Sequence, residues 1–385
     1  MEPMYYCRRQ QEVVSDFGGP MRSAISNRRA LLRQFGVAVM TAVSGIPVTA
    51  EAKRKRKKKR NPAPPSSGWS FFGSFGGGTP GNTESSPPNC VTTSQDGLTA
   101  LVTDPMNHRV AVWTRQDAES SSWIRQTTFG SAGQQAAEFN SPQGVAMSAD
   151  GRTAYIADSN NFRISIWSRA SNTDSAWSPL ATFGADADLG NPYDVAVSSD
   201  GLTAWVAEIV NHRISVWTRS DSNSTSWQLQ TTFGTSGSGP ANLNEPAAVW
   251  ASTDACTVWV ADSKNDRISV WHRPDANGQE WSAQTVFGTG GAGAAQFDAP
   301  GGLSVTADGL EIYIADVANN RVSVWSRSNA AKTTWTPKTT IGSFGTVQAS
   351  LNNPRDAHVL PDGSGLWITD PGNHQVDVWR YIEPN

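Results

Sequence analysis

A ten-residue motif recurs six times along the chain, and its spacing constrains the fold more than any other feature. The second copy reads Asp158-Ser-Asn-Asn161-Phe-Arg163-Ile-Ser-Ile-Trp167. Successive copies are 54, 50, 54, 54 and 54 residues apart and begin at Asp104, Asp158, Glu208, Asp262, Asp316 and Asp370. A period of about 50 residues indicates a repeat architecture, in which each unit buries its apolar face against its neighbours.

Each repeat predicts four antiparallel strands. Asp150-Gly151 favours a tight hairpin turn, and Ile164-Ser-Ile-Trp167 has the period-two alternation of a half-buried strand. The strands expected in the second unit cover residues 144–148, 153–157, 164–167 and 177–183. Four such strands, repeated around an axis, form the blade of a β-propeller.

The two ends of the chain predict how the ring closes. Trp69–Phe75 lies 54 residues before Trp123 and matches the fourth strand of a unit, whereas the sequence stops six residues after Trp379. We therefore expect the first strand to complete the last blade, which leaves no open sheet edge. The sequence predicts an all-β, six-bladed propeller over residues 69–385.

The turn Asp104-Pro-Met-Asn-His108-Arg109-Val, with the following Phe-Gly and x-Pro-x-Gly-Val segments, resembles the NHL repeat over residues 69–381. This family includes secreted bacterial proteins of unknown role, a peptide α-amidating lyase and RNA- or protein-binding domains of tripartite-motif proteins. The chain has no RING-like set of Cys and His, so the resemblance does not imply ligase chemistry. A lyase of the amidating type implies several channel histidines, and only His358 departs from the repeat pattern.

The N-terminal segment predicts export. Asn27-Arg28-Arg29-Ala30-Leu31-Leu32-Arg33 resembles a bacterial twin-arginine signal, and a weakly apolar run from Phe35 to Ala50 follows. Ala50-Glu51-Ala52 has the small-x-small form of a cleavage site, so residues 1–52 are interpreted as an export signal. The mature chain is then expected to lack a transmembrane span. The alternative is a disordered basic N-terminus with a chance arginine pair.

Charge is distributed unevenly along the chain. Residues 1–60 hold 14 of the 31 Lys and Arg residues and 4 of the 34 Asp and Glu residues, which leaves an acidic remainder. An acidic propeller argues against nucleic-acid binding. Lys53–Arg60 is an unbroken basic run within a tail and linker at residues 53–68. Such a run suits either attachment to an anionic envelope surface or a solvated spacer.

The repeated residues themselves are expected to be structural. The acid of each turn is placed to accept from turn amides and from the arginine, and the asparagine is assigned the left-handed position. The twelve periodic tryptophans are interpreted as packing between strands and blades.

Ligand binding is expected where the repeat is broken. At the start of the innermost strands, which should surround one mouth of the central channel, larger or polar residues replace small ones. These residues are Tyr193, Asp194, Trp250, Arg355, Asp356 and His358. The competing interpretation is ordinary variation at the rim.

The sequence favours an exported, non-catalytic propeller that binds a protein, peptide or glycan. One alternative is a divergent lyase or hydrolase in which Asp194 and Asp356 share a cation such as Ca²⁺ across a narrow channel. Another is a structural protein attached to the envelope. No phosphate loop or nucleophile elbow supports an enzyme, and no cofactor is expected.

Overall fold

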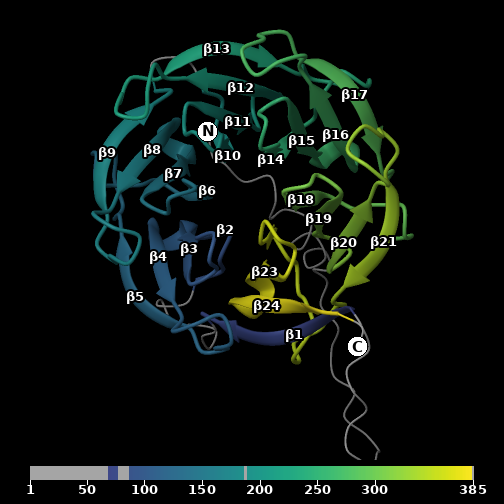
Figure 1. The fold of residues 1–385 in the computed structure, drawn as a ribbon, viewed down its shortest axis with the longest axis horizontal. Coiled ribbons are helices and arrows are strands. Elements are labelled where there is room, and N and C mark those ends of the chain that lie inside the picture. Colours follow the sequence, from purple (N-terminus) through teal and green to yellow (C-terminus); the bar gives the residue numbers. More distant parts are fainter. Residues whose placement is uncertain (1–67, 77–85, 186–188, 384–385) are drawn as a thin grey trace, which may run out of the picture. The chain divides into compact units, whose positions relative to one another are not determined.

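The computed structural model describes residues 68–76, 86–185 and 189–383. The predicted export signal at residues 1–52 and the basic run Lys53–Arg60 lie outside these residues. The described residues form six four-stranded antiparallel sheets, arranged as blades around a central axis (Figure 1). This confirms the predicted all-β, six-bladed propeller.

Each blade runs from an inner strand beside the axis to an outer strand at the circumference. The inner strands are β2 (Val91–Thr93), β6 (Pro142–Met147), β10 (Pro192–Val197), β14 (Pro246–Ala251), β18 (Pro300–Val305) and β22 (Asp356–Val359). The second strands are β3 (Thr99–Asp104), β7 (Thr153–Asp158), β11 (Thr203–Glu208), β15 (Thr257–Asp262), β19 (Glu311–Asp316) and β23 (Gly365–Asp370). We number the blades one to six in this order.

The outer half of each blade completes the sheet. The third strands are β4 (Arg109–Thr114), β8 (Arg163–Ser168), β12 (Arg213–Thr218), β16 (Arg267–His272), β20 (Arg321–Ser326) and β24 (Gln375–Ile382). The outer strands are β5 (Ile124–Phe129), β9 (Ser178–Phe183), β13 (Gln228–Phe233), β17 (Ser282–Phe287), β21 (Thr336–Ile341) and β1 (Gly68–Phe75). Single 3-10 turns join the second and third strands of four blades: η1 (Pro105–Asn107), η2 (Ser159–Asn161), η3 (Ser263–Asn265) and η4 (Pro371–Asn373). These short turns are too small to cross a bilayer, and the described residues contain no membrane-spanning helix.

The first and last strands of the described chain close the ring. In Figure 1 the purple strand β1 lies beside the yellow strand β24, and the two pair antiparallel. Phe71 is opposite Trp379, and their rings meet edge to face with centroids 5.6 Å apart. The predicted closure by Trp69–Phe75 is therefore confirmed.

The core is divided into six hydrophobic clusters, one at each interface between adjacent blades. Between blades one and two, Phe129 packs between Trp167 and Trp177, with ring centroids 4.8 and 5.5 Å away. Gly130 follows with a φ of +86°, and a Cβ there would lie 2.2 Å from the Phe139 ring. The recurring Phe-Gly pair thus lets the connecting chain turn tightly over this packed aromatic core.

Candidate functional site

The repeated turn is a buried ion-pair network. In blade two, Asp158 is fully buried and accepts hydrogen bonds from Asn140 N (2.6 Å), Asn161 Nδ2 (2.8 Å) and Arg163 Nε (2.8 Å). The Arg163 guanidinium also donates to the carbonyls of Gln134, Gln135 and Glu138. Asn140 N and the terminal nitrogens of Arg163 join this turn to the connection that precedes the blade, so the motif stabilises the blade.

One detail of the predicted turn is wrong. The left-handed residue is not the asparagine but the residue that follows it. These residues have φ values between +51° and +57° and are His108, Phe162, His212, Asp266, Asn320 and His374. The asparagine is instead used as a side-chain donor to the acid, as in Asn319 Nδ2 to Asp316 (2.9 Å). His108 Nδ1 accepts from Ser141 N (3.1 Å), which gives this repeat histidine a structural role.

A second set of arginines was not anticipated from the sequence. It follows the third strand and comprises Arg115, Arg169, Arg219, Arg273 and Arg327. Each guanidinium lies over the tryptophan that precedes the outer strand; Arg169, for example, is 4.9 Å from the Trp177 ring centroid. Arg169 Nε also donates to Gly151 O (2.6 Å) in the inner hairpin. The fixed spacing of these arginines ahead of the tryptophans was the available signal.

The central channel contains a cavity of about 230 Å³. Its walls are mainly apolar, with Val145, Val195, Val249 and Leu303 in one layer. Its rim is made by exposed residues of the six inner hairpins: Gln95, Ala149, Ser199, Thr253, Ala307 and Pro361. The cavity therefore opens on the face that carries the hairpins between the first and second strands of each blade.

The structure brings together four of the six residues predicted for ligand binding. Asp194, Trp250, Asp356 and His358 line the cavity, whereas Tyr193 and Arg355 are not among its lining residues. Tyr193 and Arg355 lie at the start of the inner strands, away from the hairpin rim. The cavity thus opens at the opposite end of these strands from the mouth proposed on sequence grounds.

Asp194 and Asp356 form equivalent contacts between blades. Asp194 Oδ2 accepts from Val249 N and Asp356 Oδ2 accepts from Val91 N, both at 3.0 Å and both on the next blade. Glycines on the preceding blade leave room for each side chain, since a Cβ on Gly144 or Gly302 would lie 2.4 or 2.0 Å from the respective Oδ1. The two carboxyl groups therefore help to hold adjacent inner strands together.

Burial changes the protonation of these groups. Desolvation, followed by the charge of Asp356, raises the pKa of Asp194 to about 7. Desolvation also raises the pKa of Asp356. Burial, with Asp356 and Asp194 nearby, raises the pKa of the Cys90 thiol well above its ordinary value, so this cysteine is not an activated nucleophile. Cys90 and Cys256 are both free.

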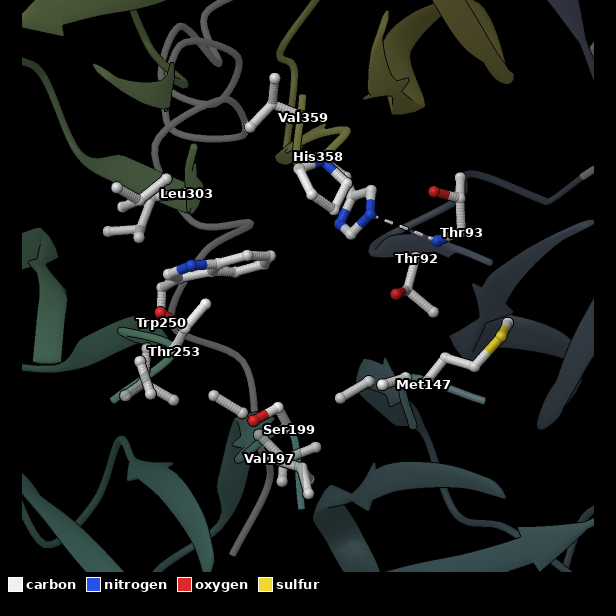
Figure 2. A pocket seen from close by; sticks show the side chains of 18 of the residues that line it. Thr92, Thr93, Met147, Val197, Ser199, Trp250, Thr253, Leu303, His358 and Val359 are labelled. Carbon is white, nitrogen blue, oxygen red and sulfur yellow. Dashed lines mark hydrogen bonds between the residues drawn. The ribbon is translucent and has the colours of Figure 1, made fainter. Parts of the chain in front are cut away.

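Trp250 and His358 narrow one side of the cavity. Figure 2 shows the two side chains pointing toward one another, and their rings meet edge to face with centroids 5.8 Å apart. The equivalent positions in blades one to three carry the smaller residues Thr92, Ala146 and Ala196, which leave space opposite.

His358 has a defined tautomer. Its Nε2 accepts a hydrogen bond from Thr93 N (3.4 Å), so the proton is assigned to Nδ1 (Figure 2). Nδ1 has no hydrogen-bond partner within the described residues and lies on the cavity side of the ring. Burial lowers the pKa of His358 to about 4, so the ring is neutral at pH 7 and presents one N–H donor.

The residues at the channel offer little to a metal ion. Ca²⁺ takes roughly six to eight oxygen ligands, whereas Asp194 and Asp356 already accept backbone N–H groups. Within residues 68–76, 86–185 and 189–383, no group of three or more His, Cys, Asp or Glu side chains is placed to hold a metal. The donor set does not fit the Ca²⁺ considered on sequence grounds.

Comparison with known proteins gives the family. The profile described as "Lactonase, 7-bladed beta-propeller" matches residues 114–385. The chain belongs to this lactonase family. It has six blades in its described residues, in contrast to the seven of the family description. No curated protein matches this lactonase-family chain in sequence.

Solved structures share the fold of this lactonase-family propeller at low identity. A Bacteroides thetaiotaomicron protein of unknown function is 14% identical, with a TM-score of 0.56 over 82% of this chain and 76% of its own. Hydrazine synthase from Kuenenia stuttgartiensis is 17% identical, with a TM-score of 0.52 over 80% and 99%. A functionally unknown Desulfotomaculum acetoxidans protein is 14% identical, with a TM-score of 0.52 over 76% and 81%. At these identities the similarity extends to the fold alone.

Proposed function

We propose that this protein is an exported, non-catalytic binding propeller that holds one group of a protein, peptide or glycan ligand in its central cavity. The observation that carries this proposal is the pairing of Trp250 and His358 at an apolar cavity that opens at the hairpin rim. The resemblance of the repeat to NHL propellers, several of which bind other macromolecules, supports a recognition role. The twin-arginine pattern at Arg28-Arg29 supports export.

The size of the cavity limits what enters it. At about 230 Å³ it is smaller than the roughly 300–1,000 Å³ of pockets that enclose drug-sized ligands. One side chain or one ring-sized group of a larger ligand therefore suits it better than a whole cofactor. The remainder of the ligand would lie across the rim formed by the six inner hairpins.

The chemistry of the lining defines the group that is bound. Trp250 supplies an aromatic surface, and His358 Nδ1–H supplies a single neutral donor. The lone pair on His358 Nε2 already accepts from Thr93 N, so this histidine has no free lone pair with which to act as a base. A largely apolar group with one hydrogen-bond acceptor is the best match to this arrangement.

Binding can be tested with variants that change the cavity in opposite directions. Trp250→Ala removes the aromatic wall, and Ala146→Phe fills the space on the other side. Both should abolish capture of ligands on peptide and glycan arrays. Leu180→Ala, at an exposed position of the outer strand β9, is the matched control and should bind as the wild type does. Unchanged binding by both cavity variants would show that another face recognises the ligand.

A second candidate function is ester or lactone hydrolysis, which the family membership favours. Asp194 lines the cavity, and its pKa of about 7 suits a base that activates water. Hydrolysis of a lactone panel that is lost on Asp194→Asn would support this role. No hydrolysis by the wild-type protein would leave binding as the proposed activity.

We also propose that the basic run Lys53–Arg60 attaches the exported protein to an anionic envelope surface. Attachment should be salt-sensitive on anionic liposomes or wall polymer. Deletion of Lys53–Arg60 without loss of attachment would contradict this part of the proposal and leave the cavity unaffected.

A further inference from the structure

Blade six lacks the cation that the other five blades place beside the turn acid. Gln375 stands where blades one to five have an arginine, and Asp377 stands where they have Ala or Ser. Asp377 is fully buried. Its Oδ1 accepts from Gln375 Nε2 (2.7 Å), while its Oδ2 has no hydrogen-bond partner within the described residues. At this turn, blade six therefore carries one buried carboxyl group more and one guanidinium fewer than its neighbours.

The guanidinium of the other blades has a specific set of partners. In blade five, Arg321 Nε lies 2.7 Å from the Asp316 carboxylate. Its two terminal nitrogens donate to three main-chain carbonyls at 2.7–3.0 Å: Ala292, Gly293 and Gln296. Arg163 and Arg267 make the equivalent four contacts in blades two and four.

The loop that supplies these carbonyls has the same backbone hydrogen bonds in blade six. Ser350 N donates to Val347 O (3.0 Å), as Gln296 N donates to Gly293 O (3.1 Å) in blade five. Asn373 Nδ2 donates to Gly345 O (3.0 Å), as the asparagine of blade five does to Gly291 O (2.9 Å). A step of 54 residues maps the three carbonyls of blade five onto Thr346, Val347 and Ser350.

We propose that blade six binds a guanidinium group from outside the chain, between the Asp370 carboxylate and the carbonyls of Thr346, Val347 and Ser350. The source is either the arginine side chain of a partner peptide or a small guanidinium compound. Thr346 and Val347 are exposed, so the loop that supplies these carbonyls borders solvent. This site is separate from the central cavity and does not depend on the proposed function.

The buried carboxyl groups of blade six favour the binding of a cation at this site. Asp370 is buried, accepts from Asn352 N (2.7 Å) and Asn373 Nδ2 (2.6 Å), and has no ion-pair partner within the described residues. Burial raises the pKa of Asp370 to about 6. Burial and the neighbouring Asp370 raise the pKa of Asp377 to about 8. An incoming positive charge would relieve the repulsion between these two carboxyl groups.

The arrangement suits a planar guanidinium better than a metal ion. In blades two, four and five, one carbonyl contacts one terminal nitrogen and two carbonyls contact the other. The three carbonyl oxygens therefore point at two different nitrogen atoms. Ca²⁺ instead requires all its oxygen ligands within about 2.3–2.6 Å of one point. The fork of a guanidinium matches this divergence.

The test is isothermal titration of the propeller, in its full chain, with acetyl-Gly-Arg-Gly-amide. The lysine tripeptide, methylguanidinium and CaCl₂ are titrated separately. We expect one arginine-tripeptide site per chain and at least tenfold weaker binding of the lysine tripeptide. Methylguanidinium that binds as tightly as the arginine tripeptide would assign the site to small compounds rather than to a peptide; both results support the site.

Two variants make the result specific. Gln375→Arg fills the site from within, so it should abolish binding and raise the Tm of the protein. Arg321→Gln opens the equivalent position in blade five and should raise the stoichiometry from one to two. Binding of Ca²⁺ without binding of either guanidinium probe, or equal binding by wild type and Gln375→Arg, would overturn the proposal.

Discussion

The repeated turn and the wall of the channel are made by the same six repeats, but they differ in how far they tolerate variation. The turn keeps an acid in all six blades and an arginine in five, with Arg–acid contacts of 2.7–3.0 Å. One position on the inner strands varies from blade to blade. Thr92, Ala146, Ala196, Trp250 and His358 line the cavity there, whereas Ser304 of blade five is buried and bonds to the inner strand of blade six. Each of the six blades must be stabilised by its own turn, so the turn residues recur. The single central cavity can be lined by a different residue from each blade, so its lining varies.

The largest expected effect comes from removing one acid of the turn. Asp316→Ala leaves the mostly buried Arg321 guanidinium without its carboxylate and removes the acceptor for Asn319 and Asp298 N. An uncompensated buried charge costs about 3–5 kcal/mol. We therefore expect the free energy of unfolding in urea to fall by about that amount.

The matched control for this prediction is Asp308→Ala in the exposed hairpin of the same blade. Asp308 accepts from Thr306 Oγ1 and Leu310 N within one solvent-exposed turn. Its loss should cost about 1 kcal/mol. An equal decrease in the free energy of unfolding for the two variants would show that the buried turn stabilises the fold no more than an exposed turn does.

The same comparison explains what the sequence could predict. Blade number, closure and the packing role of the tryptophans follow from the repeat period, because every blade uses the same spacing. The position of the cavity does not, since both ends of the inner strands carry polar residues. Hairpin residues such as Ser199 and Thr253 line the rim, while Tyr193 and Arg355 do not line the cavity. Where the cavity opens depends on the combined volumes of side chains from six inner strands, and the sequence of a single repeat does not give these volumes.

The roles of Asp194 and Asp356 were also only partly predictable. Their departure from the repeat identified them, but their contacts required the structure. Each carboxyl group reaches a backbone N–H on the next blade, and Gly144 or Gly302 on the preceding blade makes room for it. The contact of Asp194 joins residues 55 positions apart and that of Asp356 joins residues 265 apart, so both become visible only when the blades are placed side by side.

The exceptional turn of blade six gives a second prediction. Asp377 is protonated at pH 5 in the folded protein, because its pKa is raised to about 8. In the unfolded chain an aspartate titrates near 3.9. The folded state therefore binds more protons. The contribution of Asp377 to stability is fully present below pH 4 and is lost as the pH rises toward 8.

Asp377→Asn removes this titration while keeping the shape of the side chain. The variant should match the wild type below pH 4 and exceed it by about 2–4 kcal/mol at pH 8.5 in urea unfolding. Urea is preferred here because guanidinium is the ligand proposed for this blade. Parallel pH profiles for the two proteins would show that Asp377 is not held as a neutral acid.

The smallest expected effect tests whether the channel carboxyl groups behave as a pair. The pKa of Asp194 is raised to about 7 by burial and by the charge of Asp356, so its stabilising contribution is also lost as pH rises from about 4 to 7. Asp194→Asn keeps an oxygen that can accept from Val249 N. Because Asp194 partly faces the cavity, we expect a gain of only about 1 kcal/mol at pH 8 and none at pH 4.

A double-variant cycle with Asp356→Asn isolates the electrostatic part of that gain. If the two charges repel across the channel, the gains at pH 8 should combine to less than their sum, since either substitution alone removes the repulsion. Additive gains would mean that each carboxyl group is perturbed by burial alone. The cycle therefore shows whether Asp194 and Asp356 only hold the inner strands together or also interact electrostatically as a pair beside the cavity.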